Sequence, residues 1–235
     1  MSELVSYTLR GNVAEVQLHN GKVNAFSPDF ISAINGALDQ AEKDEAAVLF
    51  VGNPGVFSAG FDLKIVKAGN LQTIADMMVA GGTLCARLLE FPRPIVSAVT
   101  GHCMAQGVMF LLACDYNVAV DGDFTLGLNE TQIGMVVPQY GIELAKGRFP
   151  KHVWQRAVTQ AELYSPAVAL ELGLVDQVVE GDALMDVARA ETQRLADLDK
   201  RAFKGNKQRM RQEQIEAMRK ALAQDGSDIL TGVAG

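Results

Sequence analysis

The feature that most constrains the fold of this chain is a series of short, almost wholly apolar runs separated by segments of helical periodicity. Residues 46–51 read AAVLFV and residues 95–99 read IVSAV, and residues 71–89 between them have the apolar spacing of a long helix. Residues 116–120, YNVAV, supply a third such run. Strands without polar alternation are typical of a sheet that is buried on both faces. The sequence therefore predicts an α/β fold with helices on both sides of the sheet.

Turn and cap signals place further elements before these strands. Residues 5–18 alternate apolar and polar side chains about a central Gly-Asn pair, which predicts a β-hairpin. A Ser-Pro pair at 27–28 supplies an N-cap and a first-turn residue for a helix over 30–41.

The chain becomes mostly helical after Pro138, with a short strand expected over 174–179. We divide it into an α/β core over 1–182 and a helical C-terminal region over 183–235. Apolar stripes on the last two helices include Leu184, Val187, Ala188 and Leu195, and predict that this region mediates self-association. The helical segments expected after Pro138 are 139–147, 151–160, 165–173, 183–198 and 203–223.

Composition narrows the class of protein. A chain of 235 residues with 49% hydrophobic side chains can bury a large core. No apolar run reaches the roughly 18–20 residues of a membrane span, and the first twenty residues carry charges where a signal peptide needs an apolar stretch. We therefore expect a cytoplasmic protein without membrane association.

Cysteine and histidine are too few and too scattered for a metal centre. The three cysteines, Cys85, Cys103 and Cys114, lack the paired spacing of a zinc site or a disulfide framework, so we interpret them as reduced packing residues. The three histidines are spread over the chain, which argues against a metal site and against a Ser-His-Asp triad. No metal or redox cofactor is expected.

A basic segment near the C-terminus contrasts with the formal net charge of −7. Residues 200–220 contain eight Lys or Arg side chains against two Glu, a net of +6. Such a helix can meet phosphates, although a solvated face that balances an acidic body is the simpler interpretation. Aromatic residues do not interleave with these charges, which argues against a nucleic-acid partner.

Two segments place small residues directly after expected strands. Residues 56–64 include Ser-Ala-Gly before an expected helix, and residues 101–109 pass from Gly-His-Cys into an apolar helix. Small side chains let a ligand approach the backbone, and free N–H groups at a turn or a helix N-terminus hold negative oxygen atoms. Two such turns after neighbouring strands can direct two donors at one oxygen, although an ordinary glycine turn explains either segment taken alone.

A third segment places one carboxylate among small and apolar residues. Residues 127–138 read GLNETQIGMVVP, with Glu130 as the acidic residue. Desolvation there raises the pKa of a carboxyl group towards that of a useful general base. A solvated surface glutamate is the alternative.

Five motifs in order resemble the crotonase (enoyl-CoA hydratase/isomerase) family across nearly the whole chain. They are VNAF, SAGFDLK, AVTGHCMAQG, ACDYNVAVDGDFTLGLNETQIG and ALELGLVDQVV. The resemblance implies a spiral of ββα units, a coenzyme A thioester as substrate, and a homotrimer or a hexamer built as a dimer of trimers.

The resemblance also carries roles onto individual residues. It places the oxyanion-hole N–H groups on Ala59 and Gln106, where glutamine replaces the usual glycine of the second turn. It implies that the basic last helix, with Lys204, Lys207 and Arg211, reaches a phosphate of coenzyme A. The substrate-binding residues that it implies are Asn24, Ala25, Phe26, Ser58, Gly60, Asp62, Lys64 and Met109.

The carboxylate pattern favours one branch of the family. Hydratases of this family typically use two glutamates, and Met109 stands where the first would be, whereas Glu130 matches the second. The stretch around Glu130 resembles Δ3,Δ2-enoyl-CoA isomerases, in which one glutamate moves the proton. Pro138 occupies the position of the aspartate of dienoyl-CoA isomerases, which disfavours that activity. We therefore predict a 3-enoyl-CoA isomerase; an enoyl-CoA hydratase and a catalytically silent acyl-CoA-binding protein are the alternatives.

Overall fold

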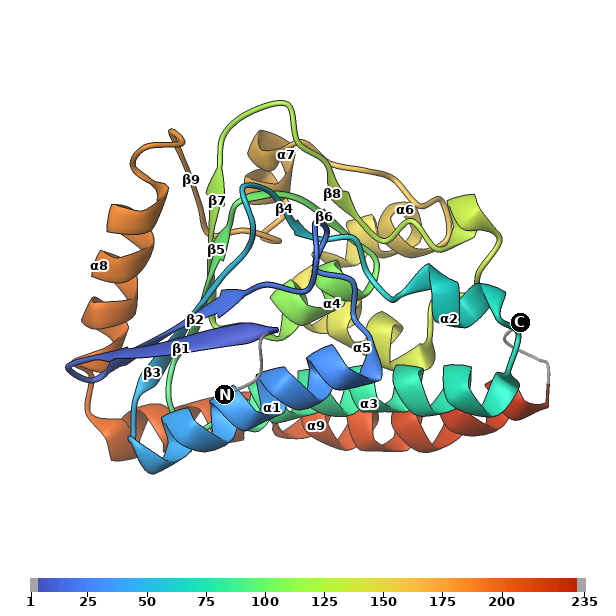
Figure 1. The fold of residues 1–235 in the computed structure, drawn as a ribbon, viewed down its shortest axis with the longest axis horizontal. Helices are drawn as coiled ribbons and strands as arrows, with labels where there is room; N and C mark the ends of the chain where they lie inside the picture. The colour runs from blue at the N-terminus through green and yellow to red at the C-terminus, as the bar shows by residue number, and fades with distance from the viewer. Residues whose placement is uncertain (1–3, 232–235) are drawn as a thin grey trace.

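The computed structural model describes residues 4–231 and arranges their strands in two sheets (Figure 1). The larger sheet has the order β1-β2-β3-β5-β7-β9, with β1 and β2 antiparallel and the remaining neighbours parallel. The smaller sheet, β4-β6-β8, is parallel. The strands are β1 (Val5–Arg10), β2 (Val13–Leu18), β3 (Ala47–Val51), β4 (Gly55–Ser58), β5 (Ile95–Val99), β6 (Gly101–Met104), β7 (Tyr116–Val120), β8 (Leu126–Gly127) and β9 (Gln177–Val179).

The two sheets alternate along the chain. Each of β3, β5 and β7 of the larger sheet is followed by the next strand of the smaller sheet, and a helical segment comes after each such pair. This repeat is the spiral of ββα units expected from the resemblance. The helices are α1 (Pro28–Lys43), α2 (Leu63–Lys67), α3 (Leu71–Glu90), α4 (Gln106–Ala113), α5 (Gln139–Arg148), α6 (Trp154–Val158), α7 (Pro166–Glu171), α8 (Leu184–Ala196) and α9 (Lys200–Leu230).

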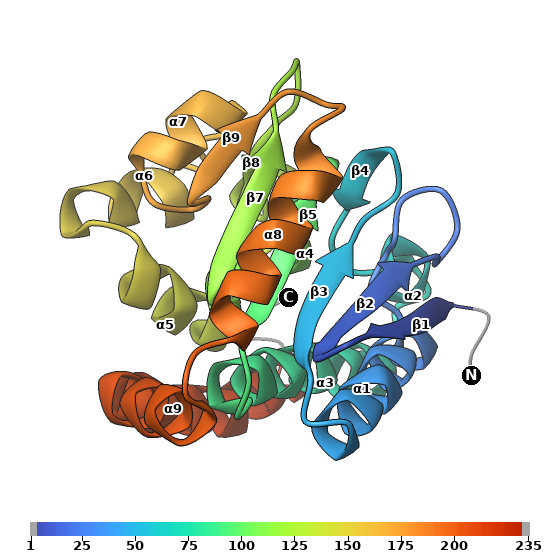
Figure 2. The same ribbon diagram turned by 90° about the vertical axis from the view of Figure 1, so that its left-hand side faces the viewer.

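The strand β3 shows why its sequence carries no polar alternation. Val48 and Phe50 point into the main core, whereas Ala47 and Leu49 pack against α8 on the opposite face of the sheet. Figure 2 shows α8 lying across that face. The predicted burial on both faces is therefore confirmed.

Among the described helices, none is both long enough and apolar enough to cross a bilayer.

The helix α4 lies at the centre of the main core, and all of its residues are buried. The ring of Phe110 contacts three other aromatic rings, with centroids 5.0–6.1 Å away, from Phe26, Phe50 and Phe57. These rings come from the segment before α1 and from strands β3 and β4. They fix α4 to the sheets, and this sets the position of its N-terminus.

The C-terminal helices pack against the core of the same protomer. Leu184 and Ala188 of α8 are buried against the larger sheet, and Val187 and Leu195 pack beside them. The helix α9 runs beside α3 and α5 (Figures 1 and 2). The apolar stripes that we assigned to self-association are therefore covered by the chain itself.

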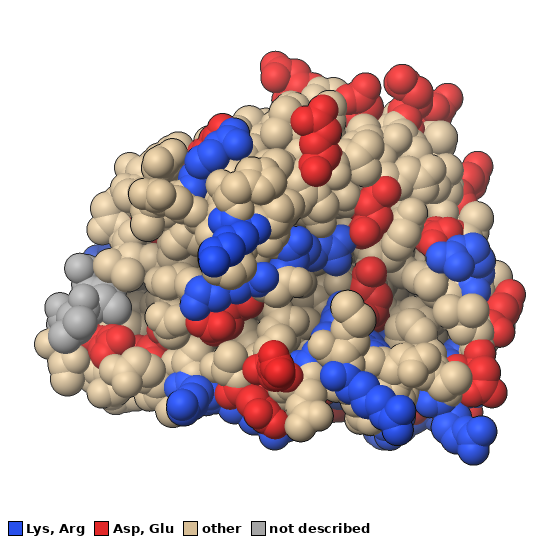
Figure 3. Space-filling view, turned by 180° about the vertical axis from the view of Figure 1, so that it is seen from behind, with Lys and Arg blue, Asp and Glu red and all other residues tan. Residues whose placement is uncertain are grey.

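Charged side chains of both signs share the surface on the side opposite to Figure 1. Figure 3 shows Lys and Arg mostly over the middle and lower part of this face, with Asp and Glu mixed among them and also along the upper and right margins. The basic segment of α9 therefore belongs to a mixed surface on this face.

Candidate active site

The loops that follow the three strands of the smaller sheet enclose a hollow of about 80 Å³. Parallel strands end at the same edge, so their following loops meet there. Helix α3 contributes Met78 to the wall. The lining residues are Ala59, Phe61, Leu63, Met78, Ala105, Asn129, Glu130, Ile133, Met135, Val136 and Pro138.

Glu130 is the titratable side chain of this hollow. It is 5% exposed, and its Oε2 atom has no hydrogen-bond partner among residues 4–231. Burial among apolar groups raises the pKa of its carboxyl group to about 7, because the charged form loses its hydration there. The backbone holds the residue in place, since the carbonyl of Glu130 accepts hydrogen bonds from Ile133 N–H at 3.0 Å and Met135 N–H at 2.9 Å. The predicted desolvated carboxylate is therefore present.

The loop after β4 presents a different N–H group from the one we predicted. The Ala59 N–H donates to the carbonyl of Val23 at 2.9 Å, and the Gly60 N–H donates to Ser58 Oγ at 3.1 Å. For Phe61, which lines the hollow, no acceptor for the N–H is found in the described part of the chain. The oxyanion role assigned to Ala59 is therefore not supported, and Phe61 takes its place as the candidate donor.

Gly60 brings this loop against the start of α4. Its φ angle is +91°, and a Cβ atom at this position would lie 2.8 Å from Ala105 Cβ and 3.4 Å from Gln106 N. Any other side chain would push the two turns apart. The candidate donor Phe61 therefore follows directly on the residue that touches the backbone of Gln106.

The second turn exposes the N-terminus of a buried helix. Ala105 has φ 51° and ψ −121°, and α4 begins at Gln106 without a side-chain cap. The first N–H groups of a helix have no intrahelical partner and carry the positive end of its dipole. This supports the predicted donor role of the Gln106 backbone.

The side chain of Gln106 points away from the hollow. Its Nε2 donates to the carbonyl of Gly81 at 3.2 Å, and its Oε1 accepts from the hydroxyl of Tyr140 at 2.6 Å. Replacing the usual glycine by glutamine therefore leaves the space beside Glu130 free.

Met109 lies behind the wall of the site. It is fully buried, and a Cβ atom added at Gly141 of α5 would meet its Sδ and Cε atoms at 2.9 Å. It does not line the hollow, so the predicted substrate contact of Met109 is not supported. A thioether fills the place where the hydratase pattern needs a second carboxylate.

The residues expected to hold coenzyme A near VNAF and Ser58 build the loop instead. Asn24 is fully buried and donates to the carbonyl of Phe57 at 3.1 Å, while Ser58 Oγ donates to the carbonyl of Asn24 at 2.8 Å. Phe26 is buried in the aromatic cluster around α4, and Ala25 is half-buried. They position Gly60 and Phe61 through the backbone.

Of the charged residues expected near coenzyme A, some make structural contacts within the protein and one has an exposed side chain. Asp62 caps α2 by accepting from the N–H of Lys64 at 2.9 Å, and the Lys64 side chain is exposed. Lys207 is buried and lies 2.6 Å from Asp115, which also pairs with Arg211 at 3.1 Å. The predicted phosphate contacts of Lys207 and Arg211 are therefore not supported, whereas Lys64 remains available at the rim.

The comparisons with known proteins agree with this geometry. The profile of the enoyl-CoA hydratase/isomerase family matches residues 8–229. The chain belongs to that family. The solved structures of similar proteins confirm the crotonase-like fold expected from the five motifs, and the match to a human enoyl-CoA isomerase confirms the resemblance to isomerases of the family.

Three similar proteins illustrate the activities that are named within this family. A solved enoyl-CoA hydratase/isomerase family protein from Pseudomonas syringae is 41% identical, with a TM-score of 0.94 over 97% of this chain and 98% of that one. A probable enoyl-CoA hydratase from Mycobacterium tuberculosis is 34% identical, with a TM-score of 0.93 over 98% and 97%. Human enoyl-CoA delta isomerase 1, a mitochondrial protein, is 32% identical over 79% of this chain. The chain spans 63% of the length of that human relative. Both activities therefore occur among the names of its relatives.

Sequence reasoning missed two residues of this site. Phe61 was overlooked because its role depends on which N–H groups the fold consumes, and the Gly-Phe-Asp motif carries no signal of that. Tyr140, which holds the Gln106 side chain, was overlooked because it follows the segment that carries Glu130 in an ordinary helical pattern.

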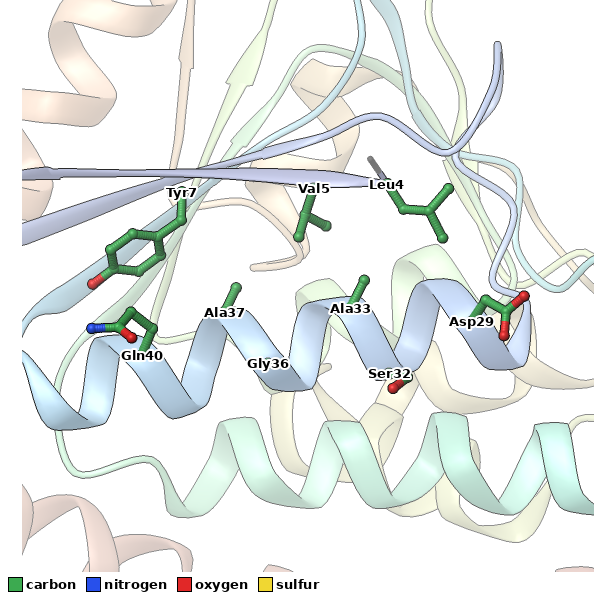
Figure 4. Close-up of a pocket in the computed structure, with 9 residues that line it drawn as sticks. All are labelled: Leu4, Val5, Tyr7, Asp29, Ser32, Ala33, Gly36, Ala37 and Gln40. Carbon is green, nitrogen blue, oxygen red and sulfur yellow. The ribbon is translucent and has the colours of Figure 1, made fainter. Parts of the chain in front are cut away.

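A larger hollow, of about 830 Å³, lies elsewhere, between β1 and α1 (Figure 4). Its side chains include Val5, Ala33 and Ala37, with Asp29 as the carboxylate among its nine lining residues. Asp29 is exposed at the start of α1. The other titratable side chain of this hollow, Tyr7, donates a hydrogen bond to Asp44 at 2.6 Å, and burial raises the pKa of that hydroxyl well above its usual range. The nine lining residues include no carboxyl group buried as Glu130 is, so size alone does not locate the chemistry.

Proposed function

We propose that this protein is a double-bond isomerase that converts 3-enoyl-CoA to 2-trans-enoyl-CoA through a 1,3-proton shift. The observation that carries the proposal is that Glu130 is the single titratable side chain among the residues lining the catalytic hollow. Moving a proton from C2 to C4 on one face of the substrate needs one carboxylate that acts first as base and then as acid. Hydration, in the pattern of this family, needs a second carboxylate to handle water.

Each step uses a group already described. Glu130 removes a proton from C2, the electrons of that C–H bond form a C1–C2 double bond, and the electrons of the thioester C=O double bond move to its oxygen to give the dienolate. The C=O double bond then re-forms, the C1–C2 electrons become the C2–C3 double bond, and the electrons of the former C3–C4 double bond take the proton back from Glu130 at C4. The N–H groups of Phe61 and Gln106 stabilise the negative thioester oxygen of the dienolate intermediate. By comparison with other oxyanion sites, each donor contributes on the order of 10²- to 10³-fold in rate, and a positioned base roughly 10²- to 10⁴-fold.

The apolar walls support the choice of isomerisation. Burial raises the pKa of Glu130 towards neutrality, which makes it a stronger base than a solvated glutamate. Met109 occupies the neighbouring core position with an apolar side chain. A dry site favours return of the proton to carbon over attack by water.

The proposal also covers the contact with coenzyme A, the absence of a cofactor, the oligomeric state and the cellular location. Lys64 is exposed one turn beyond the loop that carries Phe61, where a cation can meet a phosphate of coenzyme A. No metal or redox cofactor takes part in the proposed reaction. We further propose a homotrimer or hexamer in the cytoplasm, although the human relative is named as mitochondrial.

The proposal is tested with two substrates and one matched pair of variants. Purified protein is given 3-hexenoyl-CoA and crotonyl-CoA, and isomerisation and hydration are followed separately. We expect isomerisation by the wild type with poor hydration. Glu130→Gln should lose isomerisation by at least 10²-fold while it still binds acyl-CoA, because the amide cannot accept the proton.

The matched control is Glu171→Gln, which makes the same change at an exposed position on α7. It should behave as the wild type. Efficient hydration by the wild type would show that the reaction has been assigned wrongly. Full isomerase activity in Glu130→Gln would show that another group is the base.

A further inference from the structure

An amide side chain lies fully buried at the start of α4, in an otherwise apolar core. Gln106 has no exposed surface, and its contacts are the Tyr140 hydroxyl at 2.6 Å, the Gly81 carbonyl at 3.2 Å and Cys85 Sγ at 3.5 Å. The carbonyl of Gly81 can only accept, so the amide nitrogen must face it and the amide oxygen must face Tyr140. The orientation of the side chain is therefore determined by its partners.

These contacts link the two halves of the catalytic site. Gln106 begins the helix that presents one oxyanion donor, and Tyr140 is the second residue of α5, which follows the loop from Glu130 to Pro138. The Tyr140 hydroxyl therefore joins the donor side to the segment that carries the base. Tyr140 is fully buried, and burial holds its pKa well above its usual range, so the hydroxyl remains a neutral donor.

The start of α5 is itself anchored from the C-terminal helix. Asp225 of α9 accepts from the Gln139 N–H at 2.6 Å and from the Tyr140 N–H at 3.0 Å. A carboxylate that caps free N–H groups at a helix N-terminus fixes the first turn of that helix. Tyr140 is thus held at its backbone while its side chain holds Gln106.

On the other side of the amide, a glycine makes the necessary space. A Cβ atom at Gly81 of α3 would lie 3.1 Å from Gln106 Nε2 and 2.7 Å from the ring of Phe61. The side chains of the two residues that supply the candidate oxyanion donors therefore converge on one glycine. A small displacement at Gly81 would therefore move both residues that supply the candidate donors.

We infer that the hydrogen bond between Tyr140 and Gln106 positions the oxyanion hole: it keeps the Gln106 side chain out of the hollow and sets the Gln106 N–H relative to Glu130. This inference rests on the proposed function. Tyr140 and the Gln106 side chain act as positioning groups, because the backbone of Gln106 makes the contact with substrate oxygen. A buried amide that loses its partner pays for its desolvation and reorients towards other polar groups.

The main test is Tyr140→Phe, which removes one hydroxyl and keeps the ring. We expect kcat for 3-hexenoyl-CoA to fall about ten- to a hundredfold, since small misplacements of catalytic groups have effects of this size, with KM within about twofold. The matched control is Tyr7→Phe, which removes a hydroxyl that donates a bond of the same 2.6 Å length to Asp44, far from the site. It should leave kcat unchanged.

A rescue experiment separates positioning from general packing. Adding Gln106→Met to Tyr140→Phe replaces the unpaired amide by an apolar side chain of similar length. We expect kcat to recover to within about threefold of the wild type, because no amide is left to move into the site. A double variant as slow as Tyr140→Phe would overturn the inference.

A spectroscopic readout does not depend on turnover. Acetoacetyl-CoA forms an enolate that absorbs in the ultraviolet and presents its negative oxygen to the same donors. The wild type should lower the apparent pKa of the bound ligand below that of free acetoacetyl-CoA. Tyr140→Phe should raise it again by about one pH unit, the tenfold counterpart of the loss in kcat.

The outcomes distinguish this inference from the proposed function. If the wild type neither isomerises 3-hexenoyl-CoA nor stabilises the bound enolate, the proposed function fails and the inference falls with it. If the wild type does both and Tyr140→Phe matches it, only the positioning role is overturned.

Should Tyr140→Phe fail to fold, Gly81→Ala provides a second route. It places a methyl group from α3 against the Phe61 ring, 2.7 Å away, and against the same amide, 3.1 Å away, so it disturbs both side chains that the glycine accommodates while favouring the helix. We expect the same fall in kcat and the same rise in the enolate pKa, and wild-type values would overturn the inference.

Discussion

In the proposed mechanism, Glu130 serves catalysis at the expense of stability. Its Oε2 has no hydrogen-bond partner within residues 4–231, and its pKa is raised because burial removes water from the charged form. A solvated carboxylate would be easier to keep in a folded chain but would be a weaker base. Such an uncompensated group is typical of a functional site.

The raised pKa predicts the pH dependence of the reaction. Below a pKa of about 7, Glu130 is increasingly protonated and cannot accept a proton from C2. We expect kcat/KM to fall about tenfold per pH unit below that pKa and to reach a plateau above it. Initial rates with 3-hexenoyl-CoA between pH 5 and 9 measure this limb, and a plateau extending down to about pH 5 would contradict the assigned environment.

The same shift predicts how stability depends on pH. The carboxyl pKa is about 7 in the folded chain against an ordinary value of 4.5, so the folded state holds the proton more tightly. The stabilisation from this proton is complete below pH 4.5 and is lost as the pH rises through 7. Glu130→Gln should therefore unfold with a free energy roughly 1–3 kcal/mol higher than the wild type at pH 8.

Thermal melts at pH 5 and pH 8 test this expectation. The gain in Tm should be several degrees at pH 8 and much smaller at pH 5. An equal gain at both pH values would mean that the charge on Glu130 is not the cause.

At the scale of single residues, the sequence predicted the buried carboxylate of Glu130 but not which N–H group of the first turn is left without an acceptor in the described part of the chain. Glu130 stands out because apolar and small residues surround it in the chain, and these neighbours also surround it in the fold. The exclusion of Ala59 depends on a hydrogen bond to Val23, 36 positions earlier, which no local pattern indicates. Phe61 became the candidate only once those partners were known.

The dipole of helix α4 is used at both ends of the helix. Its N-terminus faces the hollow, and its last carbonyls accept hydrogen bonds from basic side chains: Arg211 reaches Ala113 at 3.3 Å, and Arg148 reaches Cys114 at 3.2 Å. Cations at a helix C-terminus complement the negative end of its dipole. The two arginines thus stabilise a helix that would otherwise end with carbonyls buried and unpaired.

The basic residues of α9 also anchor α9 to the core, through ion pairs with Asp115. Lys207 and Asp115 have side chains only 4% and 11% exposed, and burial lowers the pKa of Lys207 to about 8, against the opposing attraction of Asp115. Asp115→Asn should leave a buried ammonium without its carboxylate and lower the free energy of unfolding by roughly 3–5 kcal/mol at pH 7. Denaturant unfolding measures the loss.

Two controls test whether the unpaired ammonium of Lys207 causes the loss of stability in Asp115→Asn. Raising the pH above the Lys207 pKa should reduce the loss, because the amine then becomes neutral in the folded state. Combining Asp115→Asn with Lys207→Met should also reduce it. Binding of coenzyme A to Lys207→Met should equal that of the wild type, and weaker binding would restore Lys207 as a phosphate contact.

At the scale of elements, the sequence predicted the strands of the larger sheet, missed those of the smaller sheet, which lie in segments interpreted as turns, and did not predict how the last helix docks. The buried runs became β3, β5 and β7 because apolar side chains on both faces leave few other arrangements. The position of α9 could not be predicted, since its periodicity shows an apolar stripe without naming the surface that covers it. Its contacts with α3 and α5 depend on close approaches such as that of Leu222 to Gly82.

Large apolar side chains are exposed at several places on residues 4–231, and two of these places bear on function and assembly. Leu63, Ile133 and Val136 are 44–52% exposed at the mouth of the hollow, where substrate can cover them. On α9, Met210 is 90% exposed, and Leu198 lies 45% exposed just before that helix. Because α8 and the inner face of α9 are already packed, self-association through the C-terminal region would use its exposed residues, such as Met210.

The last prediction concerns assembly. We expect light scattering to give a mass near three or six protomers, because exposed apolar side chains on an otherwise polar helix mark a surface that a second copy covers in a closed assembly. Met210→Asp should lower that mass by placing a charge in the contact. Gln208→Asp, two residues away on the same helix and already exposed, provides the same charge as a control. A monodisperse wild-type monomer at micromolar concentration would refute the assembly, whereas an unchanged mass in Met210→Asp would refute only this contact.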